Sequence, residues 1–245
     1  MNTLPIELIH LIFDELDFIS KINFKTVCKQ FNTFLITDFY NIPFKFKFIL
    51  DDKILADKWY ITKLYAFVNS KIKNIKHMKN LKILYCDCIF GDCGISDEDI
   101  ENLNLTALNA DNNSKIKKIS HMSNLKFLNC SYNCGISDED IKNLNLTELY
   151  ANNNPRIKNI GHMTNLKILH CVGECRISDE DIKYLNLTEL YVNDNAKIKN
   201  ISHMSNLKVL YCGGNCEISD EDIKNLNLKE LYSIGNLKVT IKIKK

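Results

Sequence analysis

Three pairs of cysteines recur with the spacing C-x3-C, and they are Cys130/Cys134, Cys171/Cys175 and Cys212/Cys216. Pairs at such spacing occur in zinc sites, where a second pair of ligands lies nearby. The alternative is packing in a hydrophobic core, where cysteine behaves as a small apolar residue. The repeat pattern described below places the first cysteine of each pair at an inward position. We therefore predict core cysteines and expect no metal.

Four histidines also recur, each immediately before a methionine, at His77, His121, His162 and His203. In the last three units, equivalent histidines are expected to lie two coils apart, which is about 10 Å at the spacing of neighbouring strands. This distance is too long for two of them to share a metal ion, so we predict structural histidines in loops. His170 differs because it is expected at an outward strand position.

Further patterns that could support chemistry are weak. The acidic triplet of ISDEDI recurs, but it lacks the glycine turn and terminal glutamate of a calcium-binding loop, and we interpret it as a solvated helix start. No Ser/His/Asp or Cys/His set falls in a register that would bring it together. With eight glycines, the chain shows no glycine-rich phosphate loop. We therefore expect no enzymatic activity and no cofactor.

These residues recur because the chain contains tandem repeats. Residues 121–161 and 162–202 are adjacent units of 41 residues, and 28 positions are identical between them. A third unit starts at His203, and a fourth, with three extra residues, starts at His77. Units of this size cannot bury their own apolar face, so they must stack on one another.

Each unit holds two sub-units of the pattern L-x-x-L-x-(L/C/A/V)-x-x-N, of which Leu125, Leu128, Cys130 and Asn133 form one example. Counted from Ile61, nine sub-units of 20 to 24 residues follow one another. The asparagine of the pattern is expected to hydrogen-bond backbone groups of neighbouring coils. It recurs at Asn69, Asn113, Asn133, Asn154, Asn195, Asn215 and Asn236, and Glu174 replaces it once.

This pattern resembles the leucine-rich repeat family over residues 57–245. The resemblance implies an α/β repeat fold, in which a solenoid carries one strand per coil and a parallel sheet on its concave face. Serines followed by three acidic residues predict short helices on the convex side, because serine caps a helix and acidic residues favour its first turn. These serines are Ser96, Ser137, Ser178 and Ser219.

The outward strand positions form the predicted partner-binding surface. Side chains alternate across a strand, so position five of each sub-unit points outward. This column contains Tyr65, Tyr85, Asn109, Asn129, Tyr150, His170, Tyr191, Tyr211 and Tyr232. Position three adds Glu148, Ile168, Glu189, Val209 and Glu230, and position seven adds Asp111, Asn152 and Asn193. Tyrosines are good interface anchors, although they also stabilise sheets by pairing across strands. The glutamates favour a basic partner.

The composition narrows the choice of partners. The net charge is +2, and the basic residues are almost all lysine, with arginine only at Arg156 and Arg176. Because base and phosphate recognition draws heavily on arginine, nucleic-acid binding is disfavoured. No apolar run is long enough to cross a bilayer, and acidic residues interrupt the N-terminal segment where a signal peptide would be apolar. We expect a soluble protein with free thiols in a reducing compartment.

The first fifty residues differ from the rest, because nine of the twelve phenylalanines lie there. Apolar residues at helical spacing predict short amphipathic helices. The segment LPIELIHLIFDELDFISKINFKTVCKQFNTFL resembles an F-box, a small helical module that docks on the Skp-type adaptor of an SCF ubiquitin ligase. The matching contact residues are Leu4, Pro5, Leu8, Ile12, Val27 and Phe31. Phe31 stands where many members have tryptophan. The alternative is a helical cap over the open end of the repeat core.

The combined resemblance implies three parts, namely an F-box-like module at 1–45, a linker or cap at 46–56 and the solenoid at 57–245. It implies a substrate-recognition subunit that binds a Skp-type adaptor, a cullin ligase and an unknown protein substrate, with no nucleic-acid or membrane partner. A plain interaction scaffold is the alternative. Near-identical tandem units and the Asn/Lys/Ile bias also resemble F-box/repeat proteins of giant DNA viruses and amoebae. The expected location is cytoplasmic, in the host cytoplasm if the source is viral.

Overall fold

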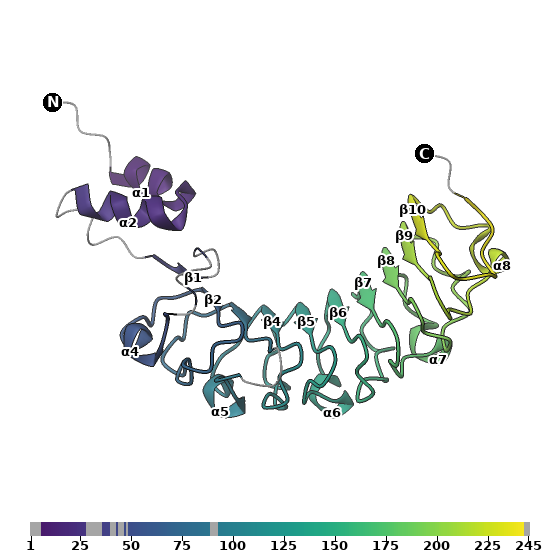
Figure 1. Cartoon of the computed structure of the whole chain (residues 1–245), viewed down its shortest axis with the longest axis horizontal. Coiled ribbons are helices and arrows are strands. Elements are labelled where there is room, and N and C mark those ends of the chain that lie inside the picture. The colour runs from purple at the N-terminus through teal and green to yellow at the C-terminus, as the bar shows by residue number, and fades with distance from the viewer. Residues whose placement is uncertain are drawn as a thin grey trace.

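The computed structural model describes residues 6–27, 36–39, 43, 47, 49–88 and 93–242. Its main element is a ten-stranded sheet in which all neighbours are parallel and follow sequence order from β1 to β10. The strands curve into an arc and line its concave side (Figure 1). They are β1 (Asp38–Phe39), β2 (Lys63–Tyr65), β3 (Ile83–Tyr85), β4 (Ala107–Asn109), β5 (Phe127–Asn129), β6 (Glu148–Tyr150), β7 (Ile168–His170), β8 (Glu189–Tyr191), β9 (Val209–Tyr211) and β10 (Glu230–Tyr232).

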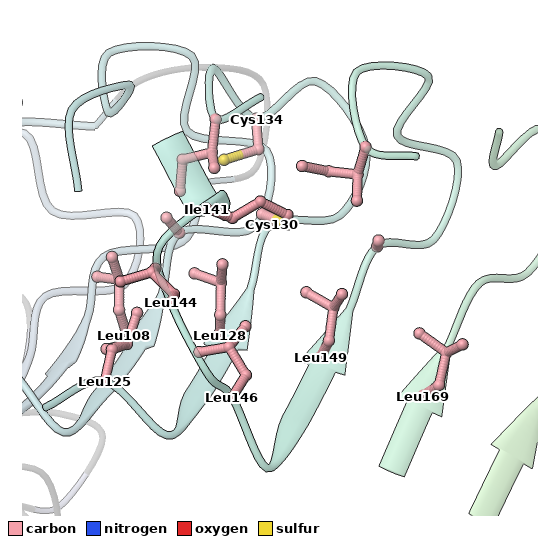
Figure 2. Close-up of a cluster of buried hydrophobic side chains, with 14 of the residues drawn as sticks. Leu108, Leu125, Leu128, Cys130, Cys134, Ile141, Leu144, Leu146, Leu149 and Leu169 are labelled. Atoms are coloured by element: carbon pink, nitrogen blue, oxygen red, sulfur yellow. The ribbon is translucent and has the colours of Figure 1, made fainter. Parts of the chain in front are cut away.

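The predicted α/β repeat fold is therefore confirmed. Strands β2 to β9 each bury their central leucine and leave the two flanking side chains half-buried on the concave face. The leucines stack because the strands pair in register, so that Leu128 is level with Leu108 on one side and Leu149 on the other. Figure 2 shows this column of leucines, with Cys130 and Cys134 further along the same core.

Short helices lie on the convex side, as predicted (Figure 1). They are α5 (Asp97–Ile100), α6 (Asp138–Ile141), α7 (Asp179–Ile182) and α8 (Asp220–Ile223), each preceded by its predicted serine. Within each acidic triplet the last aspartate bonds back to the serine; in α6, Asp140 accepts the Ser137 amide at 2.9 Å. The first aspartate joins two coils, since Asp138 accepts the amides of Lys158 and Asn159 at 2.7 and 3.0 Å.

The interpretation of each triplet as a helix start is therefore confirmed, and two of its three carboxylates are also hydrogen-bonded. Backbone amides and the capping serine hold the first and last aspartates, because the amides at a helix start and in the neighbouring turn lack backbone partners. The central glutamate is the most exposed of the three, and Glu139 and Glu180 pair with lysines one turn later. The triplets are part of the packing between coils.

The predicted hydrogen bonds from asparagine to a neighbouring coil are present in every second coil only. Five of the seven predicted asparagines are buried, namely Asn69, Asn113, Asn154, Asn195 and Asn236. Each donates its side-chain amide to a backbone carbonyl of the preceding coil or segment. Asn133 and Asn215 are exposed instead. In these longer coils the next residue, Cys134 or Cys216, turns into the core and displaces the asparagine.

The recurrent histidines and cysteines have structural roles, as predicted. Each histidine places Nε2 within 3.3 Å of the last carbonyl of a preceding helix, as His162 does with Ile141 at 3.2 Å. The six cysteines of the C-x3-C pairs are buried free thiols. Cys88 and Cys93 also lie side by side, with their Cα atoms 5.7 Å apart, a separation that a disulfide allows.

The N-terminal helices are α1 (Ile6–Glu15) and α2 (Phe18–Val27), which lie beyond the β1 end of the arc (Figure 1). The sheet begins earlier than the nine predicted strands, because β1 pairs with β2 through Phe39 and Leu64. It thus starts inside the range 1–45 assigned to the helical module. Helix α4 (Asp52–Leu55) adds Leu55 to the core at this end.

The far end of the array is more open. Leu226, Leu228 and Leu231 are only partly buried, whereas Leu185, Leu187 and Leu190, their counterparts one unit earlier, are fully buried. Beyond them, Leu237 is 94% exposed. The apolar column therefore continues to the edge of the last described coil.

Candidate functional site: an aromatic concave face and an exposed helical module

A continuous row of aromatic rings runs along the concave face. The rings of Tyr150 and His170 stack 3.9 Å apart at 14°, and those of His170 and Tyr191 stack 3.8 Å apart at 12°. Tyr211 and Tyr232 extend the row at centroid distances of 4.8 and 5.2 Å. The predicted residues Tyr150, His170, Tyr191 and Tyr211 thus lie side by side, and each is half-buried.

His170 is held in its neutral form. Burial between the two tyrosine rings lowers the pKa of His170 from 6.5 to about 4, because a charged imidazole loses hydration there. The ring therefore contributes a flat, uncharged contact surface at neutral pH. It is not a candidate acid or base at that pH.

The predicted glutamates lie beside the ring row. Glu148 and Glu189 occupy β6 and β8 and are separated by Ile168 on β7. The hydroxyl of Tyr191 donates to Glu189 Oε2 at 3.0 Å. Burial, followed by this hydrogen bond, raises the pKa of Tyr191 to about 12. The carboxylates thus hold the tyrosine hydroxyls protonated and give the face negative charge.

Sequence reasoning missed three contributors to the row. Phe127 is at position three of its sub-unit and is the first residue of β5. It fills the gap in the ring row at Asn109 and Asn129, because its ring lies 6.4 Å from Tyr85 and 5.4 Å from Tyr150. Phe67 lies 5.7 Å from Tyr65. Lys47 places its ammonium 3.4 Å from the centroid of the Tyr65 ring. The strand alternation that identified the tyrosines could have identified Phe127, but no repeat pattern points to Lys47.

Two predicted residues at position seven are part of the coil packing. Asn152 Oδ1 accepts the Val172 amide at 3.0 Å, and Asn193 Oδ1 accepts the Gly213 amide at 2.6 Å. Their acceptor oxygens are therefore engaged by the next coil.

The second candidate site is the outer face of helix α1. Leu8, Leu11 and Ile12 share one side of the helix and are 45%, 62% and 47% exposed. The opposite side is packed, since Phe13 is 2% exposed and its ring lies 5.7 Å from Phe24 on α2. Helix α1 therefore has one face against α2 and one apolar face open to solvent.

The structure describes only part of the predicted adaptor-binding set. Leu8 and Ile12 lie together on the exposed face. Leu4, Pro5 and Phe31 lie outside the described residues, as does the side chain of Val27, which ends α2. Leu11, which was not predicted as a contact, is the most exposed of the three residues on this face.

Among the described residues, Phe18 and Phe39 join the helical module to the solenoid. Phe18 at the start of α2 lies 5.8 Å from Phe39 on β1, in an edge-on arrangement. Phe39 is buried in the core of the solenoid, whereas Phe13 lies outside that cluster as described. Ile36, Phe39, Leu50 and Leu55 therefore cover this end of the core more directly than α1 does.

The N-terminal helices match a known domain family. Residues 1–38 match the sequence model of the F-box domain. The chain carries an F-box domain. Its matched range ends at Asp38, the first residue of the sheet, so the domain and the solenoid meet at β1.

Other comparisons are less specific. No curated protein sequence matches the chain. Among solved structures, a chain from the crystal structure of the yeast Rad7 and Elc1 complex is similar, with a TM-score of 0.45 and 15% identity. The match covers 76% of this chain and 66% of that one, so this chain spans just under two thirds of its length.

The described residues outside the F-box helices offer little other chemistry. Within those parts of the chain, no three His, Cys, Asp or Glu side chains gather as metal ligands. The buried Cys86, Cys130 and Cys171 thiols have pKa values well above their usual range, chiefly because burial disfavours the thiolate. No helix in the same described set has the length and apolar character to span a membrane.

Proposed function

We propose that this chain is the substrate-recognition subunit of an SCF-type E3 ubiquitin ligase. In this role the F-box domain docks on a Skp-type adaptor and so joins a cullin, and the solenoid selects a target protein for ubiquitination. The chain itself supplies binding surfaces and no catalytic group. This role requires a cytoplasmic location, in the host if the source is viral.

The exposed row of Leu8, Leu11 and Ile12 is the observation that carries this proposal. A helix that merely capped the solenoid would turn its apolar side into the core. Here the apolar side faces solvent, and exposed apolar patches of this kind mark protein interfaces. Full burial of each such side chain contributes roughly 1.5–3 kcal/mol, which makes the row a sufficient anchor. We include Leu4, Pro5, Val27 and Phe31 in the proposed adaptor contact.

The Phe18–Phe39 contact determines where the F-box domain attaches to the solenoid. It links the F-box domain to the first strand of the solenoid, so an adaptor bound to α1 and a target bound to the concave face would keep a defined relation. We retain the division into residues 1–45, 46–56 and 57–245, with β1 as the point where the first part enters the sheet.

The test is capture of the full-length chain by a purified Skp-type adaptor with cullin. The double variant Leu8→Ala/Ile12→Ala should lose at least about tenfold in adaptor affinity, because two buried anchors are truncated. Its melting temperature should change little, since both side chains are exposed in the free chain. Leu237→Ala is the matched control, because it removes an exposed leucine at the other end of the array and should leave capture unchanged.

Two results would contradict the proposal. One is failure of the wild-type chain to bind the adaptor, and the other is undiminished binding by the Leu8→Ala/Ile12→Ala variant. Either result would favour an interaction scaffold that acts outside a ligase. Target binding by the concave face would then be tested separately.

A further inference from the structure

The concave face over β6 to β10 has a regular charge pattern. Position three alternates between carboxylate and aliphatic side chains, in the order Glu148, Ile168, Glu189, Val209 and Glu230. Neighbouring parallel strands lie about 4.8 Å apart, so the backbone positions that carry the carboxylates recur about every 9.6 Å. This pattern arises because the glutamates lie in one type of coil and the aliphatic residues in the other.

These carboxylates are available to a partner. None of the ion pairs found among the described residues involves Glu148, Glu189 or Glu230. The Tyr191 hydroxyl donates to Glu189, which leaves the negative charge of the carboxylate unbalanced. A cation placed here would gain a carboxylate beside the ring row, whereas the faces of the Tyr191 ring are already stacked against His170 and Tyr211.

The lysines on the same strands do not fill this role. Lys126 and Lys208 precede the strands without a glutamate, β5 and β9. Their ammonium groups donate to the carbonyls of Asn145 and Asn227, at 3.4 and 3.3 Å, on the side where the strands begin. Lys167 occupies the same position before β7 and is exposed. These positive charges border the face, while the carboxylates lie next to the rings.

The chain itself shows that the ring row accepts an ammonium group. Lys47 lies outside the repeats, and its Nζ lies over the Tyr65 ring at 3.4 Å from the centroid. Burial lowers the pKa of Lys47. Tyr65 starts the column that Tyr150, Tyr191 and Tyr232 continue. Further along, the rings are stacked face to face and carboxylates lie beside them.

The spacing of the carboxylates fits a polyproline II segment. One turn of this helix spans about 9.3 Å for three residues, and every third side chain lies on the same side. Such a segment lying across the strands would therefore bring every third side chain to a glutamate. In a β-strand, by contrast, the third side chain points to the opposite face.

We propose that the concave face over β6 to β10 binds a polyproline II segment of the partner protein that carries lysine or arginine at every third position. Successive cations lie beside Glu148, Glu189 and Glu230, along the edge of the stacked ring row. Nucleic acid does not fit, because its phosphates would meet these carboxylates. This inference rests on the proposed function for its biological meaning, since the segment would belong to the ligase target.

The test uses the full-length chain and three fluorescent peptides of about 12 residues in the same proline- and alanine-containing background. One carries lysine at every third position, one carries the same number at every second position, and one replaces the lysines of the first by glutamate. Fluorescence anisotropy at low and moderate salt gives the affinities. We expect the first peptide to bind at least about fivefold more tightly than the second, and the glutamate peptide not to bind.

A matched pair of variants locates the site. Glu148→Gln/Glu189→Gln should weaken the first peptide about tenfold, whereas Glu139→Gln/Glu180→Gln should leave it unchanged. The control removes two glutamate charges from the convex helices of the same two 41-residue units. Melting temperatures of both variants confirm folding.

Equal affinity for the two lysine spacings, absence of peptide binding, or equal effects of the two double variants would overturn the inference. A single-stranded oligonucleotide that competes for the peptide site would also overturn it. Adaptor capture is measured on the same preparations. Loss of the spacing preference with capture intact removes this inference alone, and loss of capture with the preference intact removes only the proposed function.

Discussion

The side-chain amide of Asn154 donates to the backbone carbonyl of Cys130, 24 residues earlier, at 2.6 Å. Its Oδ1 accepts the amide of Arg156 at 2.9 Å. One buried amide thus closes a turn in its own coil and satisfies a carbonyl in the preceding repeat. The same arrangement at Asn195 and Asn236 makes it a structural rule of the shorter coils.

Replacing Asn154 by alanine should destabilise the array. The change leaves the Cys130 carbonyl and the Arg156 amide without these partners, and unsatisfied buried groups cost about 1–3 kcal/mol each. We expect a loss of about 2–4 kcal/mol in the free energy of unfolding, measured by urea denaturation. Asn133→Ala is the matched control, because Asn133 has the same place in a longer coil but is exposed. Equal losses for the two variants would contradict the distinction between coil types.

His170 should make stability depend on pH. Its pKa is about 4 in the folded chain, compared with 6.5 for a free histidine. Between these values the unfolded chain binds a proton that the folded chain does not, so stability falls as the pH decreases from 6.5 towards 4. His170→Phe keeps a ring between Tyr150 and Tyr191 and removes the titration. The difference in urea midpoint between wild type and variant should therefore change across this window and be constant above pH 7. Parallel profiles throughout would refute the assignment.

The contribution of Asp87 to stability should depend on pH in the opposite direction. Burial raises the pKa of this carboxyl from 3.8 to about 6, and its Oδ1 is buried without a hydrogen-bond partner in the described part of the chain. The folded chain holds its proton more tightly, so this group lowers stability as the pH increases from 3.8 through 6. Because this carboxyl is only half-buried, its cost is reduced, and we expect Asp87→Asn to stabilise the chain by about 1 kcal/mol at pH 7.5. Below pH 3.8 wild type and variant should have equal stability, and a constant gain at all pH values would exclude titration as the cause.

The repeat period allowed much of the fold to be predicted from the sequence. Spacing alone identifies the inward leucines, the capped helix starts and the outward tyrosines, because each depends on a residue and its close neighbours along the chain. The two-residue strand β1 was missed because Asp38 and Phe39 have no repeat pattern around them. The alternation between buried and exposed asparagines was missed because Asn133 and Asn154 occupy the same position of the sub-unit pattern. They differ only in whether the following residue turns into the core.

The candidate site was less predictable than the fold. The outward direction of Tyr150, His170 and Tyr191 followed from strand alternation, but their stacking at less than 4 Å depends on how the side chains lean. The Lys47–Tyr65 contact joins a segment outside the repeats to the first ring of the row. Likewise, the exposure of Leu8 and Ile12 depends on which side of α1 meets α2, and helical spacing cannot give that choice.

The alternation of long and short coils gives the array a natural unit of growth. A duplication or deletion that keeps both kinds of coil contact must involve one whole 41-residue unit, as the near-identity of residues 121–161 and 162–202 shows. Every junction after such an event is of a type already present, so the core tolerates the change. Each added unit would lengthen the concave face by about 9.6 Å. The number of 41-residue units thus sets the length of partner that the concave face can contact. Whole units can be gained or lost without any new kind of contact between coils.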